Sequence, residues 1–380
     1  MGFILLTEDP KTVKVLQVLP ALESGGVERG TLEIADALVR QGHDSWVASA
    51  GGRLVHELEA AGSTHTAWPL GAKTPATLLR ILPFRNWLRK QRFDIVHVRS
   101  RLPAWVTLCA LRGLPKVDCP HFITTVHGLN SVSRYSEVLT RGERVIAVSE
   151  TCRHYILENY PRTDSQKLRV IPRGVDPAYW HRSYQPSETW MDAWHREFPG
   201  LKDRFVITLP GRLTRLKGHE DFFAILENLR ADIPNITGLI VGGAAPGKER
   251  YRQELQALCQ QKGLENTVIF TGPRQDIRDI YAASDVVLSL SNKPESFGRT
   301  VLEPLAMGVP VVGYHRGGVG EILDALFPDG GVPPGAIEEA ARRIRAIRAG
   351  QHAQVKPNRQ FLLQNMQEQT LRLYREVLES

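Results

Sequence analysis

The stretch SNKPESFGRTVLEPLAMGVPVV, from Ser291 to Val312, contains two glutamates eight residues apart, Glu295 and Glu303. Glu295 precedes a Ser-Phe-Gly turn, and Glu303 lies about one turn into a helix predicted to begin near Arg299. A carboxylate on the turn could accept hydrogen bonds from sugar hydroxyls, and one on the helix could accept them from both hydroxyls of a ribose. A single glutamate at a helix start more often stabilises the helix. Two at this spacing, around a Phe-Gly turn, favour a binding site.

A second charged loop, GRLTRLKG at 211–218, follows a predicted strand and carries Arg212 and Lys217. Arginine supplies a planar fork and lysine a mobile point charge, a pair suited to a diphosphate. The alternative for this pair alone is simple solvation, as for most loop cations. The chain contains no Asp-x-Asp. We therefore predict no metal and no other cofactor, and expect Arg212, Lys217 and helix N-termini to neutralise a leaving diphosphate.

A glycine pair, Gly25 and Gly26, follows the first predicted strand and precedes a predicted helix. Glycines at a helix start let backbone N–H groups approach an anion, which suits a phosphate. The segment does not match G-x-G-x-x-G, so the alternative is a plain tight turn.

Strands and helices alternate twice along the 380 residues, which is typical of two α/β domains with parallel sheets. We predict two Rossmann-like, doubly wound domains, 1–175 and 176–358, facing each other across a cleft, and a last helix in 359–380 that packs back across their junction. A proline- and aromatic-rich break is expected at 172–199. The predicted strands are 13–19, 45–50, 95–98, 122–126, 144–148 and 168–171, then 205–209, 238–241, 268–270, 286–290 and 309–313.

Composition narrows the class of protein. The chain is 42% hydrophobic, with a formal net charge of +7. Its apolar runs are too short to span a bilayer, and its N-terminus lacks the features of a secretory signal, so we expect a cytoplasmic protein. The positive charge favours anionic partners such as nucleotide phosphates, acidic glycolipids or membrane surfaces. Nucleic acid is not expected, because RNA-binding aromatic motifs, zinc ligands and a helix-turn-helix pattern are missing.

Four segments together resemble the motif series of the retaining glycosyltransferases with the GT-B fold: GGVE at 25–28, GRLTRLKG at 211–218, PESFGRTVLEPLAMG at 294–308 and HRGGVGEIL at 315–323. IPRGVDP at 171–177 and AASD at 282–285 fit the same series. The resemblance covers nearly the whole chain. It implies a GT-B fold, with an acceptor-binding first domain and a second domain that binds a nucleotide-sugar donor.

The resemblance also implies roles for single residues. Arg212 and Lys217 would hold the donor diphosphate, and Glu303 would bind the ribose. Glu295 and the backbone of Phe297 and Gly298 would contact the transferred sugar. His127, in TTVHGLN, matches a first-domain histidine near the reacting face of that sugar, although a lone histidine after a strand is more often structural.

Two positions depart from the commonest family pattern, which has glycine at Ser296 and alanine at Pro304. Serine fits a turn, and a proline near a helix start forgoes at most one backbone hydrogen bond. Neither change argues against the fold. Both leave the identity of the donor sugar open.

The acceptor side carries a less specific resemblance. DIVHVRSRLPAW at 94–105 is similar to members of the family that build the lipopolysaccharide core, and His97, Arg99 and Arg101 are candidates to meet an anionic acceptor. The stretch ATLLRILPFRNWLRKQRF at 76–93 combines apolar and basic residues. It is either a crossover helix with a basic face or a contact with an anionic membrane, made through that face and an exposed aromatic residue.

The resemblance thus implies a metal-independent, retaining enzyme that moves a hexose-type sugar from a UDP-linked donor to a glycan or glycolipid. We expect a front-face route, in which the leaving phosphate takes the acceptor proton, since no nucleophile for a double displacement is evident. Alternatives on the same fold are a sugar-nucleotide epimerase or a phosphorylase. A regulatory protein that binds nucleic acid is the alternative outside enzymes.

Overall fold

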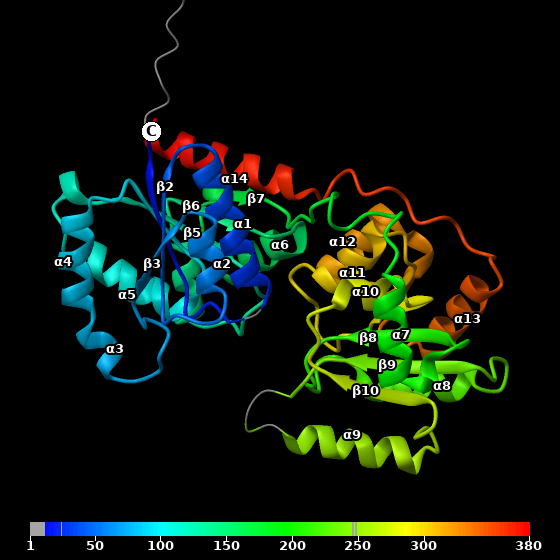
Figure 1. Ribbon diagram of the computed structural model, residues 1–380. Coiled ribbons are helices and arrows are strands. Elements are labelled where there is room, and N and C mark those ends of the chain that lie inside the picture. The colour runs from blue at the N-terminus through cyan, green and yellow to red at the C-terminus, as the bar shows by residue number, and fades with distance from the viewer. Residues whose placement is uncertain (1–11, 24, 245–246, 248) are drawn as a thin grey trace, which may run out of the picture. The chain divides into compact units, whose positions relative to one another are not determined.

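The computed structural model describes residues 12–23, 25–244, 247 and 249–380 (Figure 1). The chain forms two compact units. The first comprises the residues up to Val148, Arg153–Ile171 and Met366–Ser380, and the second comprises Ser149–Cys152 and Pro172–Asn365. Each unit contains one parallel sheet with helices between its strands. The prediction of an α/β protein with two doubly wound, Rossmann-like domains is confirmed.

The sheet of the first unit has seven strands in the order β3-β2-β1-β4-β5-β6-β7, and its neighbouring strands pair in parallel. The strand order reverses between β1 and β4. Ligands of such sheets bind beyond the carboxyl ends of the strands at the point of reversal. The strands are β1 Lys14–Val18, β2 Asp44–Ser49, β3 Thr64–Ala67, β4 Ile95–Val98, β5 His121–Val126, β6 Arg144–Ala147 and β7 Leu168–Val170.

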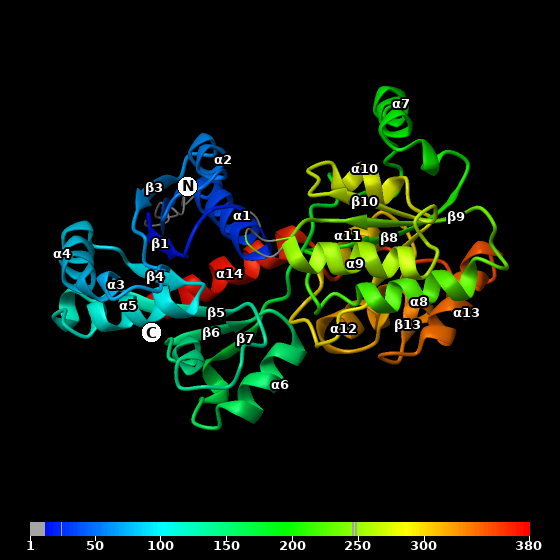
Figure 2. The same cartoon turned by 90° about the horizontal axis from the view of Figure 1, so that it is seen from below.

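Helices connect these strands, and α1 and α14 lie near each other in both views of the molecule (Figures 1 and 2). The turn that opens α1 follows β1, and α5 begins three residues after β4. Both helices therefore start at the point where the strand order reverses. The helices are α1 Gly26–Arg40, α2 Val55–Ala60, α3 Ala76–Leu79, α4 Ile81–Gln91, α5 Arg101–Leu111, α6 Glu150–Asn159 and α14 Leu363–Leu378, with short 3₁₀ turns η1 Lys116–Asp118, η2 Ser136–Thr140 and η3 Ser165–Lys167.

The sheet of the second unit has six strands in the order β10-β9-β8-β11-β12-β13, also paired in parallel. Here the order reverses between β8 and β11. The strands are β8 Phe205–Pro210, β9 Ile236–Val241, β10 Val268–Gly272, β11 Val286–Ser289, β12 Val311–Tyr314 and β13 Gly331–Val332. The helices are α7 Glu188–Glu197, α8 His219–Leu229, α9 Glu249–Gln261, α10 Ile277–Ala282, α11 Arg299–Ala306, α12 Gly317–Leu326 and α13 Ile337–Arg348, with η4 Pro199–Leu201 and η5 Pro328–Gly330.

The structure adds elements that the sequence pattern did not predict. The strand β3 has the polar sequence Thr-His-Thr-Ala at one edge of its sheet, and β13 has only two residues at the edge of the other. Neither gives the apolar run of a buried strand. The helix α7 lies inside the expected break at 172–199. It is capped by Ser187, whose hydroxyl accepts the Trp190 N–H at 3.2 Å, and Trp194 joins the core of the second unit.

The helix α14 contributes to the core of the first unit through polar contacts as well as apolar ones. The Tyr374 hydroxyl lies 2.6 Å from Nδ1 of His97 on β4, and Nε2 of His97 lies 2.6 Å from the Thr125 hydroxyl on β5. The Gln367 side chain donates to the Glu33 carbonyl of α1 at 2.8 Å. The last helix of the chain is thereby tied to the first helix and to the central strands. Among the described residues, no helix is both long and apolar enough to cross a bilayer.

We predict that Tyr374→Phe destabilises the protein by about 1–3 kcal/mol, because it removes a buried partner of His97 and leaves polar atoms unpaired. Denaturant unfolding followed by circular dichroism measures the change. The matched control is Tyr179→Phe, which removes a hydroxyl from a tyrosine that is 46% exposed. Equal unfolding midpoints for the two variants would show that the hydroxyl of Tyr374 does not hold α14 in place.

Candidate active site

The loops after β8 and β11 meet in the second unit, because these neighbouring strands flank the point of reversal. Two hydrogen bonds join the loops: the Asn292 N–H donates to the Leu216 carbonyl at 2.8 Å, and its side-chain amide donates to the Arg215 carbonyl at 2.8 Å. Gly218 has φ 72°, and a Cβ there would lie 2.0 Å from the Leu290 carbonyl oxygen. Only glycine allows this close approach.

Lys217 and Glu295 form an ion pair where the two loops meet. The Lys217 Nζ lies 2.6 Å from Oε1 of Glu295, and the hydroxyl of Ser291 donates to the same oxygen. The lysine stem passes over Gly211, where a Cβ would be 3.3 Å from Cε. Burial by itself would raise the pKa of Glu295, but the charge of Lys217 and the two hydrogen bonds outweigh it and lower that pKa. Glu295 is therefore a carboxylate at neutral pH.

Arg212 occupies the same loop as Lys217 and is exposed. Its guanidinium makes no ion pair or hydrogen bond within the described part of the chain. Lys217, by contrast, is already paired with Glu295. The structure thus brings together three predicted residues, Arg212, Lys217 and Glu295, one cation solvated and the other engaged.

The turn at 296–298 packs against the start of α12. The Glu295 carbonyl accepts the Gly318 N–H at 2.8 Å, and a Cβ on Gly318 would lie 2.4 Å from Cα of Phe297. The ring of Phe297 is buried and meets Phe361 at 5.8 Å between centroids. The aromatic ring of Phe297 is therefore part of the core of the second unit. Sequence reasoning missed the supporting roles of Ser291 and Gly318, although HRGGVGEIL marked the second of these positions.

Glu303 lies in α11, which begins at Arg299 as predicted, and only 12% of its side chain is exposed. Its Oε1 lies 3.1 Å from Nε of Arg299, one turn earlier. The salt bridge to Arg299 orients the Glu303 side chain. Pro304 sits inside α11 without ending it.

The predicted donor residues of the first unit lie at the carboxyl ends of its strands. Gly25, with φ 148°, precedes α1, and His127 follows β5 directly. A Cβ on Gly25 would lie 2.6 Å from Oε2 of Glu28, so the start of α1 already holds a carboxylate. An anion there would meet a like charge, which weakens the phosphate prediction for Gly25 and Gly26 and favours the plain turn.

The acceptor prediction is corrected for two residues. His97 and Arg99 are buried, at 1% and 4% exposed, and both reach Tyr374 of α14. Burial lowers the pKa of Arg99. The Tyr374 hydroxyl and the charge of Glu33 raise this pKa, but by less than burial lowers it. These side chains belong to the core because β4 is a central strand buried along its whole length, and Tyr374 of α14 contacts both His97 and Arg99, which directly follows the strand. Arg101 remains accessible at the start of α5, where it donates to the Ser136 hydroxyl at 3.2 Å and stacks on Tyr135.

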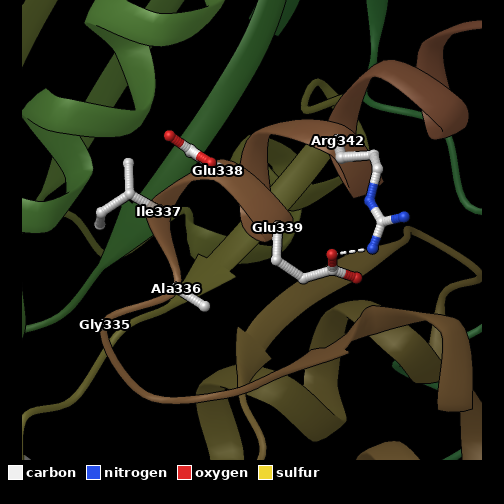
Figure 3. Close-up of a pocket in the computed structure, with 6 residues that line it drawn as sticks. All are labelled: Gly335, Ala336, Ile337, Glu338, Glu339 and Arg342. Atoms are coloured by element: carbon white, nitrogen blue, oxygen red, sulfur yellow. Dashed lines mark hydrogen bonds and ion pairs between the residues drawn. The ribbon is translucent and has the colours of Figure 1, made fainter.

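A pocket of about 690 Å³ lies at the start of α13 in the second unit, apart from these residues (Figure 3). Its rim carries an ion pair between Glu339 and Arg342. It is lined by Gly335, Ala336, Ile337, Glu338, Glu339 and Arg342. None of the predicted site residues contributes to it, and its acidic first helical turn repels a nucleotide.

No group of three or more His, Cys, Asp and Glu side chains is arranged to hold a metal ion in the described ranges. The charged groups of the β8–β11 site are one carboxylate and two cations, Glu295 with Lys217 and Arg212. This set suits hydroxyl groups and a phosphate better than a divalent cation.

Comparisons with known proteins agree with this geometry. The family model for Glycosyltransferase Family 4 matches residues 24–179, and that for Glycosyl transferases group 1 matches residues 191–361. The D-inositol 3-phosphate glycosyltransferase of Xylanimonas cellulosilytica is 31% identical over 243 residues, which cover 63% of this chain and 54% of that protein. The chain thus spans little more than half of the length of this curated relative.

Solved structures match over nearly the whole chain. A glycosyltransferase from Rickettsia africae superposes with a TM-score of 0.83 at 29% identity and covers 98% of this chain and 100% of its own. Anabaena HepE, solved with UDP-glucose, superposes with a TM-score of 0.80 at 21% identity over 96% of this chain and 99% of its own. Because the two family models match both units and these structures share the fold, the protein belongs to the GT-B-fold glycosyltransferases of the family 4 type.

Proposed function

We propose that this protein transfers a hexose-type sugar from a nucleotide-sugar donor, UDP-linked, to a hydroxyl of a glycan or glycolipid, with retention of configuration and without a metal. The observation that carries the proposal is the Lys217–Glu295 ion pair at the point where the strand order reverses, with the exposed Arg212 in the same loop as Lys217. Ligands of open α/β sheets bind at this point.

The donor would lie across the two loops. Arg212 and Lys217 offer the positive charge that a diphosphate requires, and the start of α11 adds backbone N–H groups. Glu303, held by Arg299, would accept the ribose hydroxyls, and Glu295 would accept hydroxyls of the sugar. The choice of UDP and of a hexose draws on HepE, which was solved with UDP-glucose.

The neighbouring His219 adds no charge to this site at neutral pH. It is 1% exposed at the start of α8, and its ring meets Tyr251 at 5.8 Å. Burial lowers the pKa of His219 to about 4, against the opposing charge of Glu220. The positive charge that would face a diphosphate thus comes from Arg212 and Lys217 and not from His219.

We favour a front-face route for the transfer. The bond between the sugar C1 and the donor phosphate oxygen breaks, and the acceptor oxygen bonds to C1 on the same face. The acceptor proton passes to the departing phosphate oxygen, so that atoms and charge balance. The carboxylate of Glu295 is tied to Lys217 and Ser291, which makes it a poor nucleophile for the alternative double displacement. His127 would contact the reacting face of the sugar.

We propose that the acceptor is an intermediate in the synthesis of the lipopolysaccharide core or a related cell-surface glycan, at the cytosolic face of the membrane. The support is the resemblance of residues 94–105 to enzymes of that class. Arg101 and the neighbouring Tyr135 supply a partly buried cation and an exposed ring beyond β4 and β5, a combination that suits an anionic glycan. Buried His97 and Arg99 are left out of this role.

A sugar-nucleotide epimerase or a phosphorylase would use the same donor site. The epimerase would turn over the nucleotide sugar without a separate hydroxyl acceptor. The phosphorylase would instead cleave a glycan with inorganic phosphate and release a sugar 1-phosphate. Product analysis with and without an added acceptor glycan distinguishes the three reactions. A nucleic-acid-binding role is not supported by any feature of the described structure.

We predict that Glu303→Ala weakens UDP binding by about 1.5–3 kcal/mol, the usual contribution of a hydrogen bond to a charged group. His127→Ala should retain UDP affinity and lose turnover, because its proposed contact is with the sugar. Isothermal titration calorimetry measures the UDP affinity of both variants, and an assay of product formation measures their turnover. Glu338→Ala, in the pocket at the start of α13, is the matched control. Loss of UDP affinity in that variant, with Glu303→Ala unaffected, would move the nucleotide site to the pocket.

We predict full activity in excess EDTA and a product that keeps the anomeric configuration of the donor. The cations of the β8–β11 site carry the first expectation, since they can neutralise the leaving diphosphate without a metal. The family resemblance carries the second. NMR coupling constants of the product report its configuration. Chelator-sensitive turnover contradicts the metal-free mechanism, and an inverted product contradicts the assignment as a retaining enzyme.

We predict that acid sensitivity of folding depends partly on His219. The unfolded histidine titrates near pH 6.5 and the folded one near 4, so folding favours its neutral form. Its contribution to stability is complete above pH 6.5 and declines as the pH falls towards 4, by on the order of 2–3 kcal/mol. His219→Leu should flatten this decline in urea titrations across that range. His154→Leu, at an exposed position, should leave it unchanged; a decline identical in both variants would refute the assignment.

A further inference from the structure

Three leucines of the first unit lie in solvent. Leu78 and Leu79 in α3 and Leu82 in α4 are 61%, 78% and 61% exposed. Leucine is among the residues most often buried, and neighbouring exposed apolar side chains mark interaction sites. Both views show α3 and α4 together at an edge of this unit, next to α5 (Figures 1 and 2).

The exposure of these leucines does not come from a loosely packed helix. The inner face of α4 is filled by Phe84 and Leu88, which are at most 2% exposed, and Phe84 stacks on Trp87 with centroids 5.6 Å apart. Arg85 fixes α4 to α5 by donating to the Ala110 and Cys109 carbonyls, each at 3.0 Å. The helix is therefore held with Leu82 outward.

The surrounding surface is strongly basic. No acidic residue occurs between Glu59 and Asp94, whereas this stretch contains six lysines and arginines. Arg80 and Arg85 are bound to backbone carbonyls, and the other four cations are exposed, with Arg89 in an ion pair of 3.2 Å to Asp118 of η1. Together with the three leucines they form what we call the α3–α4 surface: Leu78, Leu79, Leu82, Lys73, Arg89, Lys90 and Arg92.

We propose that the α3–α4 surface docks the protein on an anionic lipid bilayer, with the leucines at the boundary between headgroups and acyl chains and the cations at the lipid phosphates. An amphipathic helical surface that combines exposed leucines with an excess of basic residues is typical of interfacial membrane binding. This inference rests on the proposed function in one respect: a lipid-linked acceptor would require the enzyme to work at a membrane surface.

The structure changes the residues that were expected to make this contact. An exposed aromatic residue was expected, but Trp87 packs among Trp46, Trp68, Phe84 and Phe93. Arg85 is committed to α5. The leucines, which the sequence pattern assigned mainly to the core, are the exposed apolar group.

Co-sedimentation of the full chain with vesicles tests the proposal. One vesicle set contains phosphatidylcholine with phosphatidylglycerol, and the other contains phosphatidylcholine alone. We expect the protein to partition into the anionic vesicles only. The variant Lys73→Gln, Arg89→Gln, Lys90→Gln should partition about 100-fold less, since each cation contributes about fivefold. The variant Leu78→Gln, Leu79→Gln, Leu82→Gln should lose at least about tenfold.

The matched control is Lys202→Gln, Arg204→Gln, Arg252→Gln, which removes three exposed cations from the second unit and should leave partitioning unchanged. Equal binding to both vesicle types, or equal losses in the control and the first-unit charge variant, overturns the proposal. If the leucine variant binds anionic vesicles as well as the unchanged protein does, the leucines do not enter the bilayer. The proposed docking through the leucines is then wrong, because the protein adsorbs through its charge alone.

UDP affinity, measured on every variant, shows that each one is folded and separates the two proposals. A protein that binds UDP and ignores vesicles keeps the proposed function and loses the membrane surface. A protein that binds anionic vesicles through the α3–α4 surface and does not bind UDP keeps the surface and loses the function.

Discussion

The ion pair between Lys217 and Glu295 depends on the reversal of strand order in the second unit, and the rest of the candidate site depends on that pair. Because β8 and β11 are neighbours, a lysine and a glutamate 78 residues apart in the chain reach each other at 2.6 Å. A partly buried carboxylate needs such a partner. The close contact at Gly218 and the hydrogen bonds of Asn292 hold the two loops in the arrangement that allows it.

Much of this arrangement could be predicted from the sequence. The apolar strand cores are short, separated by helix-length segments and rich in β-branched residues, so eleven of the strands were expected near their observed positions. The helix start at Arg299 followed from the preceding glycine turn. The polar edge strand β3 and the two-residue β13 could not be found in this way, because their stability comes from pairing with a neighbouring strand and not from their own pattern.

The destinations of single side chains were harder to predict. His97 and Arg99 lie at a strand end rich in polar residues, which looks like a ligand-binding edge until α14, far along the chain, is seen to supply Tyr374. A hydrogen bond between residues 277 positions apart has no local signal in the sequence. The same limit applies to Arg85, which looks like part of a basic face and instead binds the carbonyls at the end of α5.

The Lys217–Glu295 pair also bears on how a donor could be accommodated. The charge of Lys217 lowers the pKa of Glu295, and the two side chains form an ion pair that is about one quarter exposed to water. A bound diphosphate would compete with Glu295 for Lys217, and sugar hydroxyls would replace the lysine as hydrogen-bond donors to the carboxylate. The number of charge-assisted contacts is then conserved when donor binds. A site of this kind needs little rearrangement, because its two key side chains are already oriented, Lys217 by its packing on Gly211 and Glu295 by its hydrogen bond from Ser291.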